Sequence, residues 1–186
     1  MAEVAKDCIG LVEFNSIAVG IEAADAMLKV SEVELLVAKT VCPGKYICLV
    51  RGDVAAVHSS VRAGVDRGAE TVVDEMVLPR VHPGVFPAIN ATSAVDEVEA
   101  LGIIETFSVA SSIQAADAAA KAAKVVLIEV RLAVGLGGKS FVTLTGEVAA
   151  ARAAVQAGAA VVQPKGLLMR TVVIPAPKPE LARSLL

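Results

Sequence analysis

The chain has 186 residues, a formal net charge of −3 and 55% hydrophobic residues, and its mean hydropathy is +0.68. The acidic balance excludes a nucleic-acid partner, because binding a phosphate backbone needs a basic surface. With one Tyr and no Trp, the chain also lacks aromatic platforms on which bases could stack. Apolar residues in excess of one small core predict large interfaces between subunits.

The high hydropathy does not predict a membrane protein. The longest uncharged runs, such as 153–164, are well short of the roughly 18 apolar residues that a membrane span needs. Glu3, Lys6 and Asp7 interrupt the start of the chain, so no signal peptide is expected there. Three cysteines without a CxxC spacing are typical of reduced thiols in the cytoplasm and not of a disulfide framework.

The first half of the chain predicts six elements in the order β-α-β-β-α-β. Ser16 and Asp53 are suitable N-caps for the two helices, and Pro43-Gly44 is a turn between two apolar runs. The predicted strands are 9–14, 33–41, 46–51 and 71–78, and the predicted helices follow the two caps as far as about Val30 and Arg67.

The second half of the chain repeats the first. Gly10, Glu13 and Ser16 fall on Gly102, Glu105 and Ser108 at an offset of 92 (102 − 10), and Lys29 falls on Lys121. After a two-residue insertion, Gly44-Lys45 meets Gly138-Lys139. The prediction is an α/β (more strictly α+β) chain of two tandem ferredoxin-like domains, residues 1–90 and 91–186. Segment 88–100 is expected to be an exposed connection, and the tail with Pro175, Pro177 and Pro179 is expected to continue neither a strand nor a helix.

Residues 133–140, Ala-Val-Gly-Leu-Gly-Gly-Lys-Ser, match a relaxed phosphate-binding loop. That chemistry needs Gly-Lys-Ser to open a helix whose N-terminal amides hold the phosphate. Residues 141–145 instead alternate and are rich in strand formers. A tight glycine-rich turn before a strand is therefore the favoured interpretation.

Cys42 is the most informative candidate for chemistry. It stands at the tip of the predicted turn, and Lys39 and Lys45 flank it, which would favour the thiolate. The alternative is a small, half-buried turn residue. One cysteine cannot hold an iron–sulfur centre alone, since such centres usually need about four thiolates, so only symmetry could supply the others.

The remaining candidates favour structural roles. Cys8, Cys48, His58 and His82 have no metal-ligand spacing. The recurrence of Glu13 as Glu105 is explained most simply by a duplicated structural hydrogen bond. No Ser-His-Asp set, HExxH or GxSxG is present, so nothing predicts an enzyme.

Four segments of the first half resemble bacterial microcompartment shell proteins. They are Gly-Leu-Val-Glu (10–13), Ala-Ala-Asp-Ala-Met-Leu-Lys (23–29), Thr-Val-Cys-Pro-Gly-Lys (40–45) and Gly-Asp-Val-Ala-Ala-Val (52–57). Both halves resemble that domain, so the likeness extends over nearly the whole chain. The chain is similar to the tandem-domain class, in which three copies form a pseudohexameric tile, and within it to the iron–sulfur trimers. The resemblance implies a structural shell subunit in the cytoplasm, with a homotrimer and other shell proteins as partners.

The resemblance also implies roles for particular residues. Cys42 would give one of three thiolates to a [4Fe-4S] cluster on the three-fold axis, for electron transfer across the shell to a redox partner inside. The edge contacts between tiles would come from Lys29, Lys121 and Arg80, while Val172, 92 residues on from Arg80, leaves the second edge in doubt. The pore loops would be Thr40, Val41, Cys42, Pro43, Gly44 and Lys45 in one copy and Gly135, Leu136, Gly137 and Gly138 in the other.

Two alternatives to this function remain open. One is a cluster-free tile whose pore passes metabolites. The other is a ferredoxin-like regulator that binds a small molecule.

Overall fold

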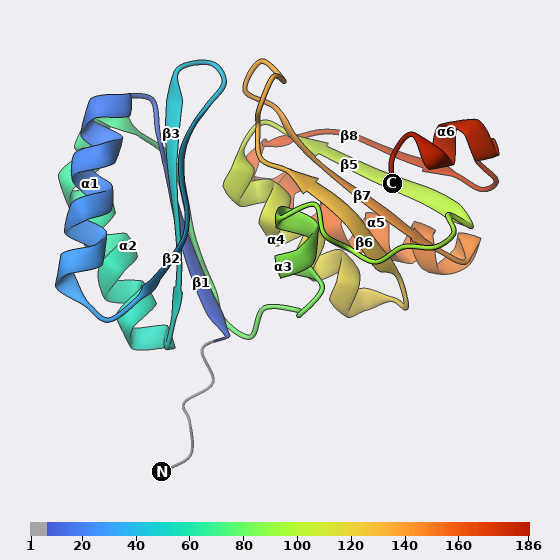
Figure 1. Ribbon diagram of the computed structural model, residues 1–186, viewed down its shortest axis with the longest axis horizontal. Coiled ribbons are helices and arrows are strands. Elements are labelled where there is room, and N and C mark those ends of the chain that lie inside the picture. The colour runs from blue at the N-terminus through green and yellow to red at the C-terminus, as the bar shows by residue number, and fades with distance from the viewer. Residues whose placement is uncertain (1–6) are drawn as a thin grey trace, which may run out of the picture. The chain divides into compact units, whose positions relative to one another are not determined.

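The computed structural model describes residues 7–186 and divides into two compact units between Val81 and His82 (Figure 1). Each unit has a four-stranded antiparallel sheet, with strand order β2-β3-β1-β4 in the first and β6-β7-β5-β8 in the second. The duplicated βαββαβ order and the predicted fold class are confirmed.

The first unit contains β1 (Cys8–Phe14), α1 (Ile17–Val30), β2 (Glu34–Val41), β3 (Lys45–Gly52), α2 (Val54–Gly68) and β4 (Val72–Leu78). The second contains α3 (Val85–Ile89), β5 (Ala100–Thr106), α4 (Val109–Ala122), β6 (Val126–Arg131), β7 (Ser140–Gly146), α5 (Val148–Val162), β8 (Leu168–Ile174) and α6 (Pro179–Arg183).

The predicted caps form because short polar side chains satisfy amides at the helix starts. The Ser16 hydroxyl accepts from the amide of Val19, and the Asp53 carboxylate accepts from the amide of Ala56 at 2.8 Å. Ser108 repeats the first cap by accepting from the amide of Ser111. Glu147, which replaces Asp53 in the second unit, makes no side-chain cap.

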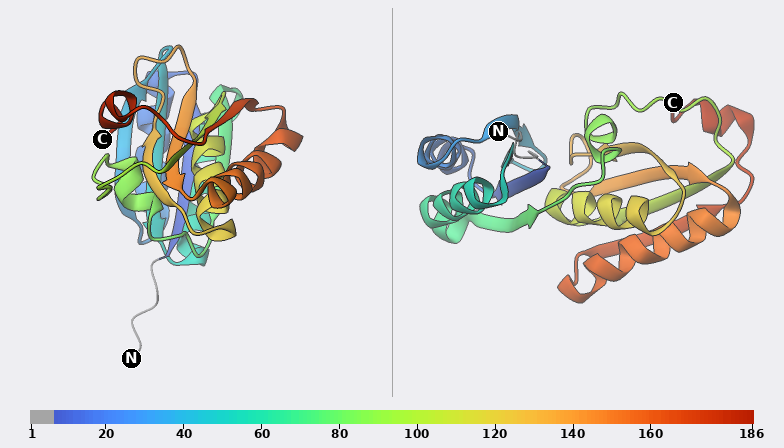
Figure 2. Two further views of the ribbon diagram at one scale, coloured as in Figure 1. Left: turned by 90° about the vertical axis from the view of Figure 1, so that its right-hand side faces the viewer. Right: turned by 90° about the horizontal axis from the view of Figure 1, so that it is seen from below.

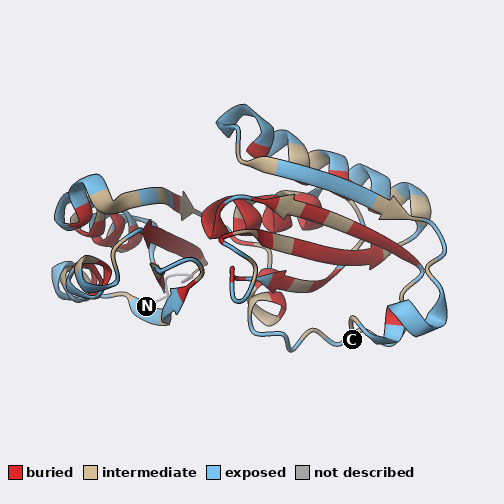
Figure 3. Ribbon diagram, turned by 90° about the horizontal axis from the view of Figure 1, so that it is seen from above, coloured by how far each residue is buried: buried red, intermediate tan, exposed pale blue. Residues whose placement is uncertain are grey.

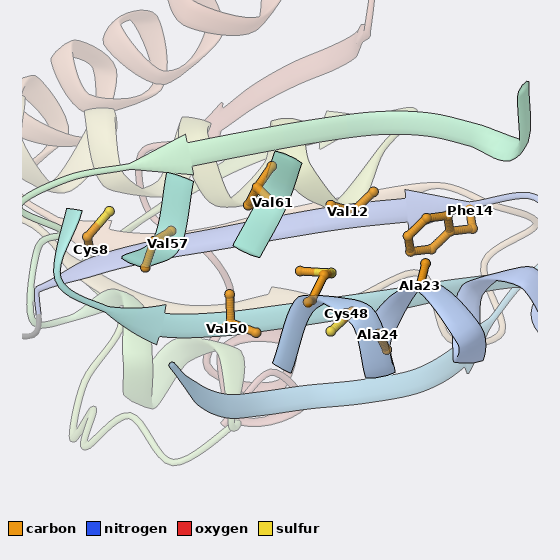
Figure 4. Close-up of a cluster of buried hydrophobic side chains, with 10 residues drawn as sticks. Cys8, Val12, Phe14, Ala23, Ala24, Cys48, Val50, Val57 and Val61 are labelled. Atoms are coloured by element: carbon orange, nitrogen blue, oxygen red, sulfur yellow. The ribbon is translucent and has the colours of Figure 1, made fainter. Parts of the chain in front are cut away.

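The core of the first unit lies between its sheet and the helices α1 and α2, and Figure 4 shows this cluster of side chains. Val12 and Phe14 of β1 and Cys48 and Val50 of β3 belong to it. Successive strand side chains point to opposite faces, so Glu13 of β1 lies on the face turned away from these helices. In the second unit, α4 and α5 likewise cover one face of the sheet (Figure 2).

The difference in residue number between equivalent positions of the two units, called the offset here, grows along the chain. It is 92 between β1 and β5, 94 between α2 and α5, and 96 between β4 and β8 (168 − 72). The increase from 94 to 96 comes from a two-residue insertion in the turn before β8. The true counterpart of Arg80 is therefore Ala176 and not Val172, so that comparison was wrong because it carried the offset of 92 past both insertions. Val172 instead lies within β8, which is exposed along most of its length (Figure 3).

Two short helices were not predicted. Helix α3 takes up the start of segment 88–100, with Ala88 buried, and Ala100 at its end is also buried as the first residue of β5. Strand β8 ends at Ile174, directly before Pro175, as expected, and α6 is a new helix that starts at Pro179. Proline is well suited to the first turn of a helix, where its missing amide would have no partner in any case.

Candidate functional site

The loop between β2 and β3 is a tight turn at one end of the first sheet. Val41 and Lys45 are paired in the register, so Cys42, Pro43 and Gly44 form the tip. Gly44 has a φ of +73°, in the left-handed region that favours glycine, and the Cys42–Pro43 peptide bond is cis. The Cys42 side chain is partly exposed. The structure thus places this thiol at an accessible loop tip, as the sequence predicted.

The other two cysteines lie in the core of the first unit. Cys8 and Cys48 are fully buried. Burial raises the pKa of the Cys48 thiol to about 12, and burial together with the neighbouring carboxylates Asp7 and Asp53 raises the pKa of Cys8. Both thiols are kept protonated, and a thiol that is not ionised is a poor ligand and nucleophile. Cys42 is the one cysteine of this chain suited to chemistry.

Lys45 has a partner that the sequence analysis did not assign to it. Its ammonium lies 2.8 Å from Oε1 of Glu13, which is fully buried, while the Lys45 side chain is 15% exposed. The two residues meet because Glu13 pairs with Ile47, and Lys45 lies two residues earlier on the same face of β3. The positive charge of Lys45 is therefore matched by a carboxylate, which weakens the argument that Lys45 favours a thiolate at Cys42.

The same ion pair recurs in the second unit. Lys139 lies 2.6 Å from Oε1 of Glu105, at the positions equivalent to Lys45 and Glu13. The interpretation of the recurrent glutamates as a duplicated structural hydrogen bond is confirmed. Glutamate and lysine recur together at matching positions of the two units. This joint recurrence in the sequence could have been used to predict that they pair.

The loop before β7 differs from its counterpart in length and in backbone. Ala133, Gly135, Gly137 and Gly138 all have positive φ, which suits a glycine-rich turn. Ser140 begins strand β7, so Gly-Lys-Ser opens a strand and not a helix. The rejection of a phosphate-binding loop is confirmed. Gly135, Leu136, Gly137 and Gly138 form the loop tip that corresponds to Cys42, Pro43 and Gly44.

Beside each ion pair, a row of side chains crosses the sheet on the face turned away from the helices. In the first unit the register aligns Lys39, Ile47, Glu13 and Asp74. In the second it aligns Arg131, Phe141, Glu105 and Arg170. Asp74 beside one glutamate is thus replaced by Arg170 beside the other. This reversal of charge is not apparent in the sequence repeat, because strands β4 and β8 align only at the offset of 96.

The predicted edge residues lie outside this loop region. Lys29 pairs with Asp25 on the exposed surface of α1, and Lys121 pairs with Asp117 at 2.7 Å on α4. Asp117 is 4% exposed and also accepts from the amide of His82 at 2.8 Å. Arg80 is exposed in the turn after β4, with a φ of +51°.

A metal bound at Cys42 would need ligands from beyond the described part of this chain. Within residues 7–186, no cluster of three or more His, Cys, Asp or Glu side chains could hold a metal ion. A partly exposed thiol at a loop tip fits an iron–sulfur cluster that several chains share, with one thiolate from each. In the same part of the chain, no helix combines the length and apolar character that crossing a membrane requires.

The fold and its duplication define a tandem-domain α/β protein, and comparison with known proteins identifies its family. The BMC domain model matches residues 8–81 and again 100–177. The chain therefore belongs to the family of bacterial microcompartment shell proteins, which confirms the predicted resemblance.

Individual relatives agree with this assignment. The chain is 44% identical to "Bacterial microcompartment shell protein PduT" of Citrobacter freundii, over 97% of this chain and 98% of the relative. A crystal structure of a microcompartment protein from Desulfitobacterium hafniense has 58% identity and a TM-score of 0.86, covering 94% of this chain and 97% of that one. The fused permuted hexameric shell protein MSM0275 shares the fold, with a TM-score of 0.62 at 23% identity over 83% of this chain and 84% of that one.

Proposed function

We propose that this shell subunit forms a homotrimeric, pseudohexameric tile whose central pore carries a [4Fe-4S] cluster bound by Cys42 of each chain. The observation that carries the proposal is the placement of Cys42, a partly exposed thiol at a loop tip, in a chain whose other cysteines are buried. Three chains then supply three thiolates, which leaves one iron for water or another external ligand. A cluster held in a pore that crosses the shell would transfer electrons to a redox partner inside.

The surface of α1 supports the formation of an oligomer. Ile17, Ile21 and Leu28 are 39%, 53% and 37% exposed and lie on one stripe of the helix. The equivalent residues of α4, Val109, Ile113 and Ala120, are 0%, 0% and 8% exposed. An exposed apolar stripe of this kind is typical of an interface, and further copies of the chain would cover it.

The test of the cluster is anaerobic purification and reconstitution, followed by visible and EPR spectra and iron analysis. We expect one cluster for every three chains in the wild type and none in Cys42→Ala. Cys48→Ala is the matched control, since its thiol lies in the core, and it should keep the full iron content. A colourless wild-type trimer without iron would refute the cluster and leave the shell function intact.

A cluster-free tile whose pore passes metabolites is the first alternative. Here the loops at Cys42 and at Gly135–Gly138 would line the pore without binding iron. Iron analysis separates the two functions directly.

A small-molecule-binding regulator is the second alternative, and a cavity of about 580 Å³ in the second unit favours it. Lys124, Glu97, Glu99 and Glu147 contribute to its lining. This function predicts saturable ligand binding and no sheets in electron micrographs, whereas a shell tile predicts sheets.

We also propose that Lys29, Lys121 and Arg80 form contacts between neighbouring tiles. The exposure of Lys29 and Arg80 and the position of both lysines at helix ends are compatible with this role.

A further inference from the structure

We propose that Glu13 is a positioning residue for Cys42 and acts through its ion pair with Lys45. The inference rests on the proposed cluster and adds to it a residue that sets the charge and the geometry of the cysteine loop. Glu13 lies on strand β1 and not in the loop, and its recurrence as Glu105 pointed only to a structural hydrogen bond.

The geometry gives Glu13 a mechanical role. Strand β1 is central in the sheet, with β3 on one side and β4 on the other, and Glu13 is fully buried there. Lys45 is the first residue of β3 and follows directly on the loop tip. The 2.8 Å contact between their side chains therefore ties the base of the loop to a central strand that is buried along its whole length. A hydrogen bond between charged groups is stronger than a neutral one, so it suits this purpose.

The same contact gives Glu13 an electrostatic role. Lys45 is three residues from Cys42 across a tight turn, so its ammonium is among the charges nearest to a cluster bound there. Glu13 holds that ammonium and balances its charge, and Asp74 follows Glu13 in the row across the sheet. Removing Glu13 leaves more positive charge beside the cluster, and removing Lys45 leaves more negative charge.

The second unit supplies a matched control. Lys139 and Glu105 repeat the pair at 2.6 Å, but the adjoining loop has glycines and Leu136 where the first unit has Cys42. Substitutions of this pair remove the same contact without disturbing a cysteine loop.

The test compares Glu13→Gln, Lys45→Met, their double variant, the pair-preserving Lys45→Arg and the control Glu105→Gln. The reduction potential of the cluster in the reconstituted trimer is the first readout. We expect Glu13→Gln to shift it to more positive values, because positive charge stabilises the reduced cluster, and Lys45→Met to shift it to more negative values. The double variant should lie between the two, and Lys45→Arg should resemble the wild type. Glu105→Gln should shift the potential less than Glu13→Gln.

The second readout needs no cluster. The rate at which iodoacetamide labels Cys42 is measured in the iron-free protein at one fixed pH. We expect this rate to be roughly tenfold higher in Glu13→Gln, because the loop loses the free energy with which a hydrogen bond between charged groups holds it in place. Glu105→Gln should label at the wild-type rate.

These readouts separate the inference from the proposed function. Shifts of one sign in both single variants, or equal effects of Glu13→Gln and Glu105→Gln, would overturn the role of Glu13 while the cluster stands. A wild-type trimer without iron would refute the cluster, and the labelling rates alone would then decide whether Glu13 positions Cys42.

Discussion

Gly158 of α5 lies against the backbone of α4 at Ala115. A Cβ atom built on Gly158 would stand 2.7 Å from the carbonyl oxygen of Ala115, which cannot move without moving the helix. Its counterpart Gly64 in α2 is equally crowded, but there the nearest atoms belong to the flexible Met27 side chain, at 2.7 Å. Both units therefore have a glycine at this position, but it packs against rigid backbone in the second unit and against a flexible side chain in the first.

The first prediction concerns these two glycines. Alanine in a helix is intrinsically better than glycine by about 1 kcal/mol, and overpacking costs about 1–3 kcal/mol. We expect Gly158→Ala to destabilise the protein by up to about 2 kcal/mol, and Gly64→Ala to have an effect near zero because Met27 can adjust. Urea unfolding of both variants measures the difference. Equal free energies of unfolding would contradict the distinction between backbone and side-chain contacts.

The second prediction compares the acidic partners of Lys29 and Lys121, the two proposed edge lysines. Asp117 is buried and holds both Lys121 and the amide of His82, whereas Asp25 pairs with Lys29 on an exposed surface. We expect Asp117→Ala to cost about 1–3 kcal/mol, because a partly buried amide loses its acceptor and Lys121 loses its partner. Asp25→Ala should cost less than about 0.5 kcal/mol, as exposed pairs do. The same unfolding measurement applies, and a larger loss in Asp25→Ala would be the contrary outcome.

The third prediction concerns alkaline pH. Burial raises the pKa of Cys48 from 9.0 to about 12, so the folded protein keeps a proton that the unfolded chain releases. Its contribution to stability is complete below pH 9 and is lost as the pH rises towards about 12. The free energy of unfolding should fall by up to about 1.4 kcal/mol per pH unit from this group. Cys48→Ala should show a shallower slope above pH 9, whatever its stability at neutral pH, and parallel slopes would exclude Cys48 as a source.

The fourth prediction tests the proposed edge contacts. Arg80→Ala should leave the trimer intact in size-exclusion chromatography and reduce sheet formation in electron micrographs, since Arg80 is exposed and outside the core. Ala176→Arg, at the true counterpart in the second unit, adds an arginine where this chain has none and serves as the reciprocal variant. Sheets of normal extent in Arg80→Ala would argue against an edge role for this residue.

Much of the fold follows from local signals in the sequence. Ser16 and Asp53 are recognisable caps because their side chains bond to amides within the same helix turn. The strands on either side of Pro43-Gly44 are equally local. The repeat then extended each prediction from one unit to the other.

The sequence was less informative where a contact joins distant residues or where an insertion changes the register. Glu13 and Lys45 are 32 residues apart, and only the pairing of β1 with β3 brings them together. The alignment of Arg80 failed because the second insertion lies in a turn without a distinctive motif. Helix α6 was missed because proline was judged by its effect inside a helix and not at the first turn.

The covalent linkage of two unlike loops has a consequence for assembly. If the loops were carried by separate single-domain proteins, mixed rings would contain them in variable numbers and orders, and few rings would present three thiols in alternation. In this chain the two loops are made in equal numbers, and closure of the proposed three-chain ring would determine their order as well. In the proposed trimer, the presence of both loops on one chain would replace a statistical mixture with one defined composition around the axis.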